Sequence, residues 1–192
     1  VVQKRLQILA ELGQIREATR ALWGLAWRSG GRVPSRARGG HGAGMARPVR
    51  TIVVDANLMM GLAAPLDYSE RATALMEKWL QGRARLYAPL LWTYELTTAM
   101  RKTVALGMFT EEQATAVLER LLGLGVECIA PDAGLPVEAL RWAGRLGQVA
   151  AYDAQYLALA ARLDAEFWSA YERLVERARA RGANWAHHIS EA

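Results

Sequence analysis

From residue 51 onward, short β-branched segments alternate with amphipathic helical segments, and this alternation constrains the fold more than any other feature. The run Ile52-Val53-Val54 is typical of a strand that is buried on both faces. Strands separated by helices require right-handed crossovers and a parallel sheet. The sequence therefore predicts an α/β fold, a three-layer α/β/α sandwich with a central, mostly parallel sheet over residues 51–192. Its strands are expected at 51–55, 84–88, 126–130, 166–170 and 183–189.

Capping signals mark where some of the intervening helices begin. Asp67 and Glu70 have the spacing of a capping box ahead of a helix that Gly82 closes, and Thr110 and Gln113 have the same spacing ahead of another. Further helices are expected at 89–107, 136–146, 150–163 and 171–182.

The first 50 residues differ in character from the rest of the chain. Residues 2–28 have the leucine spacing of one amphipathic helix, and residues 29–50 form a linker rich in Gly, Arg and Pro. Two interpretations stay open: Met45 is the natural start and the residues before it come from upstream coding sequence, or the helix binds a partner or packs on the domain. Residues 1–44 hold eight Lys and Arg against two Asp and Glu, whereas residues 45–192 hold sixteen against seventeen. The overall net charge of +5 therefore does not by itself indicate a polyanion partner.

Composition narrows the class of protein. The chain is 52% hydrophobic and 22% charged, and its longest apolar stretches are far shorter than the roughly 18 residues of a membrane span. The first residues lack the apolar core of a secretory signal. The single cysteine, Cys128, excludes an internal disulfide and a structural zinc site, and is expected to be a small core residue. We expect a cytoplasmic protein that does not bind membranes.

Three isolated acids are candidates for a functional site. Asp55 directly follows the first strand, at the carboxyl end where α/β sheets bind ligands. Glu95 lies in a helix among bulky apolar residues, and Asp153 lies in the first turn of a nearly apolar helix. Capping is the alternative explanation for Asp55, and the helix dipole for Asp153. An exposed helix stripe is the alternative for Glu95.

Carboxylates gathered in one cleft repel one another, and another interaction must offset this repulsion. A close pair of carboxylates repels by roughly 4 kcal/mol at an effective dielectric near 20, so raised pKa values or a bound cation must offset the repulsion. Oxygen ligands alone suit Mg²⁺ or Mn²⁺. His41, His187 and His188 lie away from the acids in sequence, and no Gly-rich phosphate loop follows the first strand.

The order of motifs resembles a known family. VVDAN at 53–57, a Pro89-x5-Glu95 helix, YDAQYLALA at 152–160 and FWSAYERL at 167–174 resemble the PIN domain, in particular the VapC-like ribonuclease toxins of toxin–antitoxin pairs. The resemblance spans about residues 50–190. It implies a PIN-like nuclease domain that binds Mg²⁺ or Mn²⁺ and hydrolyses phosphodiester bonds of single-stranded RNA, with an antitoxin partner and a homodimer.

The resemblance also assigns the site residues. Asp55, Glu95 and Asp153 match three metal-binding catalytic acids of the family, Asn57 matches a polar residue near the first, and Ser169 a hydroxyl residue beside the fourth. The metal would activate a water and neutralise charge on the phosphate.

The fourth acid is where this chain departs from the family. The usual T-A-D-x-R-L reads Ser169-Ala170-Tyr171-Glu172-Arg173-Leu174 here, so a tyrosine replaces the aspartate. A protonated phenol with an ordinary pKa near 10 is a poor Mg²⁺ ligand. Two alternatives to a ribonuclease therefore stay open: a catalytically weakened or inactive PIN-fold module that binds RNA or protein, and a different α/β hydrolase or phosphotransfer enzyme that shares only the architecture.

Overall fold

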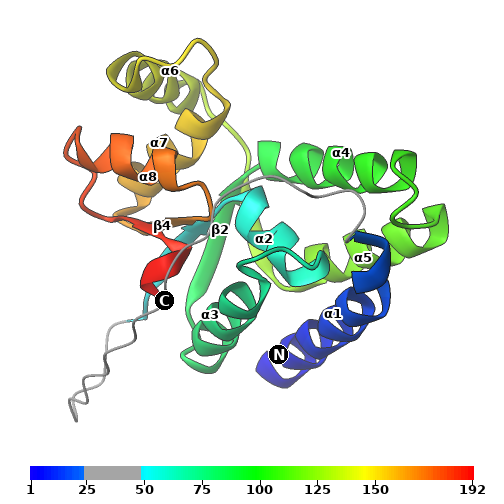
Figure 1. Ribbon diagram of the computed structural model, residues 1–192. Coiled ribbons are helices and arrows are strands. Elements are labelled where there is room, and N and C mark those ends of the chain that lie inside the picture. Colours follow the sequence, from blue (N-terminus) through cyan, green and yellow to red (C-terminus); the bar gives the residue numbers. More distant parts are fainter. Residues whose placement is uncertain (24–48) are drawn as a thin grey trace.

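A five-stranded, all-parallel sheet lies at the centre of the computed structural model, which describes residues 1–23 and 49–192 (Figure 1). The strand order is β3-β2-β1-β4-β5, with β1 in the middle. The strands are β1 (Thr51–Val54), β2 (Arg85–Pro89), β3 (Val126–Ile129), β4 (Glu166–Ser169) and β5 (Ala186–His188).

Helices cover both faces of the sheet and complete the three layers. Figure 1 shows α2 to α5 on one side, and α6, α7 and α8 on the other. This division follows from the topology, because right-handed crossovers toward β3 and toward β5 must run over opposite faces. The helices are α1 (Val2–Trp23), α2 (Ala56–Ala63), α3 (Ser69–Gln81), α4 (Leu91–Ala105), α5 (Glu111–Gly123), α6 (Gly134–Leu146), α7 (Tyr152–Leu163) and α8 (Glu172–Arg179), followed by a short 3-10 helix at Ile189–Glu191.

The central strand has the burial that its composition predicts. Ile52, Val53 and Val54 have no solvent exposure, because helices cover β1 from both sides. Strand order reverses at β1, whose neighbours are β2 on one side and β4 on the other. The carboxyl end of β1 is therefore the topological switch point, where open α/β sheets bind their ligands.

The N-terminal helix packs on the domain. Helix α1 contacts α2, α3 and α5, and its Leu9 and Leu12 side chains are buried in that interface. The guanidinium of the buried Arg16 donates hydrogen bonds to the Gly61 carbonyl and to Thr73 Oγ1, at 3.3 and 2.8 Å. The end of the predicted helix at 28 and nearly all of the predicted linker at 29–50 lie outside the described residues.

Two local predictions need correction and one is confirmed. Helix α2, which begins directly after Asp55, was not expected from the sequence. The proposed Asp67 capping box is wrong, because α3 begins at Ser69 with Tyr68 at its N-cap and no side chain caps it. The capping box of α5 is confirmed: Thr110 Oγ1 accepts from the Gln113 amide at 3.2 Å, and Gln113 Oε1 accepts from the Thr110 amide at 2.9 Å.

Two further observations concern the single cysteine and the apolar character of the helices. Cys128 lies on the edge strand β3, where it is half-buried and packs against the core as a small apolar residue. No helix within residues 1–23 or 49–192 combines the length and the apolar character that crossing a bilayer requires.

Candidate active site

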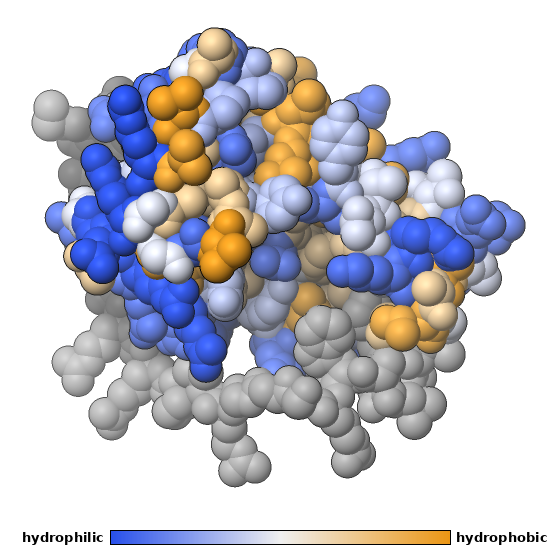
Figure 2. Space-filling view, turned by 90° about the horizontal axis from the view of Figure 1, so that it is seen from above, coloured by the Kyte–Doolittle hydropathy of each residue, from blue (hydrophilic) through white to orange (hydrophobic). Residues whose placement is uncertain are grey.

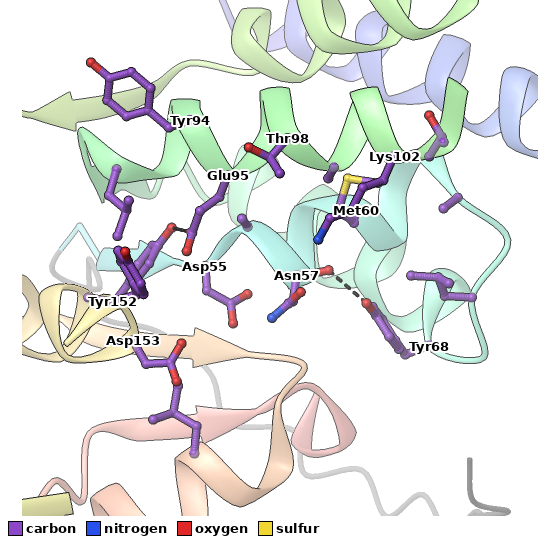
Figure 3. Close-up of a pocket in the computed structure, with 18 of the residues that line it drawn as sticks. Asp55, Asn57, Met60, Tyr68, Tyr94, Glu95, Thr98, Lys102, Tyr152 and Asp153 are labelled. Carbon is purple, nitrogen blue, oxygen red and sulfur yellow. Dashed lines mark hydrogen bonds between the residues drawn. The ribbon is translucent and has the colours of Figure 1, made fainter. Parts of the chain in front are cut away.

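A cavity of about 700 Å³ opens at the carboxyl end of β1. Its walls come from α2, α4 and α7, with a further contribution from the loop that joins α2 to α3. Figure 2 looks onto this end of the sheet, where hydrophobic residues are exposed beside hydrophilic ones. All three candidate acids, Asp55, Glu95 and Asp153, line the cavity, and Figure 3 shows their carboxylates pointing into the same space.

Asp55 is the most buried of the three acids, with 5% of its surface exposed. It is the N-cap of α2, and its Oδ1 accepts from the Leu58 amide at 2.7 Å. Its Oδ2 accepts a hydrogen bond from the hydroxyl of Ser169, which is fully buried at the end of β4. Capping and a place in the candidate site are therefore two roles of one carboxylate.

The environment of Asp55 favours its neutral form. Burial raises its pKa to about 7, because a carboxylate loses its hydration there. The hydrogen bonds from Ser169 and Leu58 oppose the shift, while the charges of Glu95 and Asp153 add to it. A cation in the cavity would offset both the desolvation and the repulsion.

The carboxylate of Glu95 is oriented by a hydrogen bond from a tyrosine on another helix. The hydroxyl of Tyr156, on α7, donates to Glu95 Oε2, on α4. Burial raises the pKa of Glu95, the Tyr156 hydrogen bond counteracts part of this shift, and the charge of Asp153 adds to it. Burial and the Glu95 charge also raise the pKa of Tyr156, so its hydroxyl stays a donor.

The carboxylate of Asp153 accepts a hydrogen bond from a side-chain amide. Gln148 Nε2 donates to Asp153 Oδ2 at 3.0 Å, from the loop that precedes α7. Burial raises the pKa of Asp153, and the Gln148 hydrogen bond opposes this. Each of the three acids is thus oriented by an uncharged side-chain donor, and in the described chain none of them forms a salt bridge.

The donor set is chemically suited to a hard divalent cation, although it is not a closed cage. Within residues 1–23 and 49–192, no three Asp, Glu, His or Cys side chains lie close enough together to hold a metal ion. Mg²⁺ commonly binds through one or two carboxylates, several waters and a substrate phosphate. The raised pKa values of three facing carboxylates fit this open mode, because a cation would relieve an unfavourable accumulation of charge.

The two supporting residues lie at the site in different ways. Asn57 lines the cavity and is exposed, and its backbone carbonyl accepts a hydrogen bond from the Tyr68 hydroxyl at 2.9 Å (Figure 3). Ser169 does not line the cavity. Its hydroxyl donates to Asp55 Oδ2 and so orients the carboxylate, while its Oγ accepts a hydrogen bond from the Tyr171 amide at 2.9 Å.

The fourth family position contributes no carboxylate to the cavity. Tyr171 is the N-cap residue of α8, is 44% exposed and does not line the cavity. Glu172 begins α8, is exposed and also lies outside the cavity lining.

Sequence reasoning missed the two donors Tyr156 and Gln148. A signal for Tyr156 was present, because it follows Asp153 by three residues and so shares its helix face. For Gln148 we find no such signal, because it lies in a loop whose conformation depends on tertiary packing. Leu91, Glu95, Thr98 and Lys102 follow one another along α4 at intervals of three or four residues, and all four line the cavity.

Comparisons with known proteins add the fold alone. No protein-family model matches the chain. No curated protein matches it either. Among solved structures, the crystal structure of PAE2754 from Pyrobaculum aerophilum is similar, with a TM-score of 0.55 and 24% sequence identity. The match covers 74% of this chain and 85% of that one, so the architecture described here has a counterpart among experimental structures.

Proposed function

We propose that this chain is a metal-dependent endoribonuclease that hydrolyses phosphodiester bonds of single-stranded RNA, with Mg²⁺ or Mn²⁺ as its cofactor. The observation that carries the proposal is the convergence of Asp55, Glu95 and Asp153 on one cavity at the switch point of the sheet. These acids come from three distant segments, and each has a raised pKa. Perturbed carboxylates in a cleft are typical of catalytic sites.

Each residue has a defined part in this proposal. One or two of the carboxylates of Asp55, Glu95 and Asp153 would bind the cation directly, with waters and the substrate phosphate completing its ligands, and the remaining carboxylate would act through a bound water. The cation would lower the pKa of a coordinated water and neutralise charge on the phosphate. Ser169 and the Leu58 amide fix both oxygens of Asp55. Tyr156 and Gln148 orient the other two acids and leave one oxygen of each without a side-chain donor among the described residues.

The toxin role, the antitoxin partner and the homodimer rest on the family resemblance alone. We also propose a second function, because Tyr171 puts an exposed phenol where the family has its fourth acid. In that case the chain is a catalytically weakened PIN-fold module that binds RNA or protein.

The deciding experiment is cleavage of labelled single-stranded RNA with Mg²⁺ or Mn²⁺, and with EDTA as the metal-free reference. We expect the wild type to cut, Asp55→Asn to abolish cutting and Tyr171→Asp to increase it. Asp67→Asn is the matched control, because Asp67 is an exposed acid outside the cavity lining. Full activity in Asp55→Asn contradicts the proposed nuclease. A silent wild type together with an active Tyr171→Asp variant favours the binding module.

A further inference from the structure

The cavity extends well beyond the three acids. Helix α4 forms one wall, along which Glu95, Thr98 and Lys102 follow one another at helical spacing. Lys102 follows Glu95 by seven positions in the helix, which corresponds to a rise of about 10 Å. The cavity therefore has a carboxylate end and, two helical turns away, a cationic end.

Lys102 presents its charge to this space. Figure 3 shows its amine pointing into the cavity, beside Met60 and on the side of Asn57. The side chain is exposed, and within the described residues it forms no ion pair. An unpaired ammonium at the edge of a cavity is available for an anionic ligand group.

The cavity lining also includes apolar side chains, of which Met60 lies beside the Lys102 amine in Figure 3. A nucleobase can bury its apolar surface against such side chains. The residues are Met60, Ala64, Leu66, Leu106 and Met108.

We infer that Lys102 binds a phosphate of the RNA strand next to the phosphate at the carboxylates, with the intervening base against these apolar side chains. This inference rests on the proposed RNA substrate and adds a binding residue to it. The site then binds an extended RNA strand at two phosphates. The acids lie at the phosphate that is cleaved, and Lys102 determines which linkage of the strand is placed there.

Neutralisation of a single charge tests the inference. The dissociation constant of a short fluorescent single-stranded RNA is measured by anisotropy over a range of salt concentrations, with Ca²⁺ in place of Mg²⁺ so that the carboxylates keep a cation. A gel confirms that the RNA stays intact during the measurement. Each phosphate contact on a single strand contributes about 0.7 to the slope of log K against log salt, so losing one weakens binding about fivefold near 0.1 M salt. We expect both changes in Lys102→Met.

Arg101→Met is the matched control. Arg101 is the neighbouring cation on the same helix, it is exposed, and it does not line the cavity. The two variants remove the same charge, so a general electrostatic attraction predicts equal effects, whereas a contact inside the cavity predicts an effect of Lys102→Met alone. Thermal unfolding of both variants confirms that they are folded.

The contacted phosphate is then located by replacing each linkage of the RNA in turn with a neutral methylphosphonate. We expect one replacement to weaken binding to the wild type and to leave binding to Lys102→Met unchanged. Equal losses in the two variants, or no RNA binding by the wild type, overturn the inference. RNA cleavage that persists with unaltered binding in Lys102→Met overturns the role of Lys102 and leaves the proposed nuclease standing. Binding through Lys102 without any cleavage removes the nuclease and keeps the phosphate contact.

Discussion

Burial of Asp55 makes the stability of the metal-free protein depend on pH in a direction opposite to that of an ordinary salt-bridged acid. Its pKa rises from 3.8 to about 7 on folding. The stabilisation from binding the proton is therefore fully present below about pH 4 and is lost progressively as the pH rises through 7. At 1.36 kcal/mol per pKa unit, a shift of about three units corresponds to about 4 kcal/mol.

The variant Asp55→Asn isolates this contribution. Asparagine is close in shape to the protonated acid, and its carbonyl can still accept the hydrogen bond from the Leu58 amide. Any fixed cost of the changed contact with Ser169 is the same at all pH values, so it cancels when two pH values are compared.

We expect the free energy of unfolding of Asp55→Asn, relative to that of the wild type, to increase by about 4 kcal/mol between pH 4 and pH 8, because only the wild type loses stability over this range. Urea denaturation at a series of pH values, without divalent cations, measures the difference. Asp67→Asn makes the same chemical change at an exposed acid and should show no such trend. A difference between Asp55→Asn and the wild type that stays constant within about 1 kcal/mol over this range would refute the reasoning.

Two further predictions concern the N-terminal helix and the tyrosine at the site. Leu12→Ala should lower the free energy of unfolding by about 2–5 kcal/mol, because Leu12 is fully buried between α1 and the domain; the exposed Lys4→Ala serves as its control in the same urea titration. Tyr156→Phe should raise the pKa of Glu95, because it removes the hydrogen bond that stabilises the charged carboxylate, and an unchanged Glu95 titration by carbon NMR would contradict this.

The order of strands and helices was predictable because burial on both faces leaves a distinctive sequence. Strand β1 contains three consecutive β-branched aliphatic residues, Ile52, Val53 and Val54, and all three have no exposure. Helix α2 was missed because it is eight residues long, largely apolar, and separated from β1 by the single residue Asp55. Periodicity cannot separate so short an apolar run from the strand before it.

The candidate site was predictable in its acids and not in their partners. Asp55, Glu95 and Asp153 stand out because each is a single charge in apolar surroundings. Their donors depend on how separate elements pack: the Tyr156 hydroxyl reaches Glu95 from 61 residues away. The false capping box at Asp67 shows the reverse error, in which a local pattern had the right spacing and the chain began its helix two residues later.

The hydrogen bond between Ser169 and Asp55 has a consequence for the order in which the candidate site assembles. The two residues are 114 positions apart, and the bond forms only when β4 adds to β1. During synthesis, a nascent chain can already contain Asp55, Glu95 and Asp153 and still lack the strand that holds the first of them. A partly made chain would therefore contain all three acids before it contains the contact that orients Asp55, and the candidate site is completed only when β4 is in place.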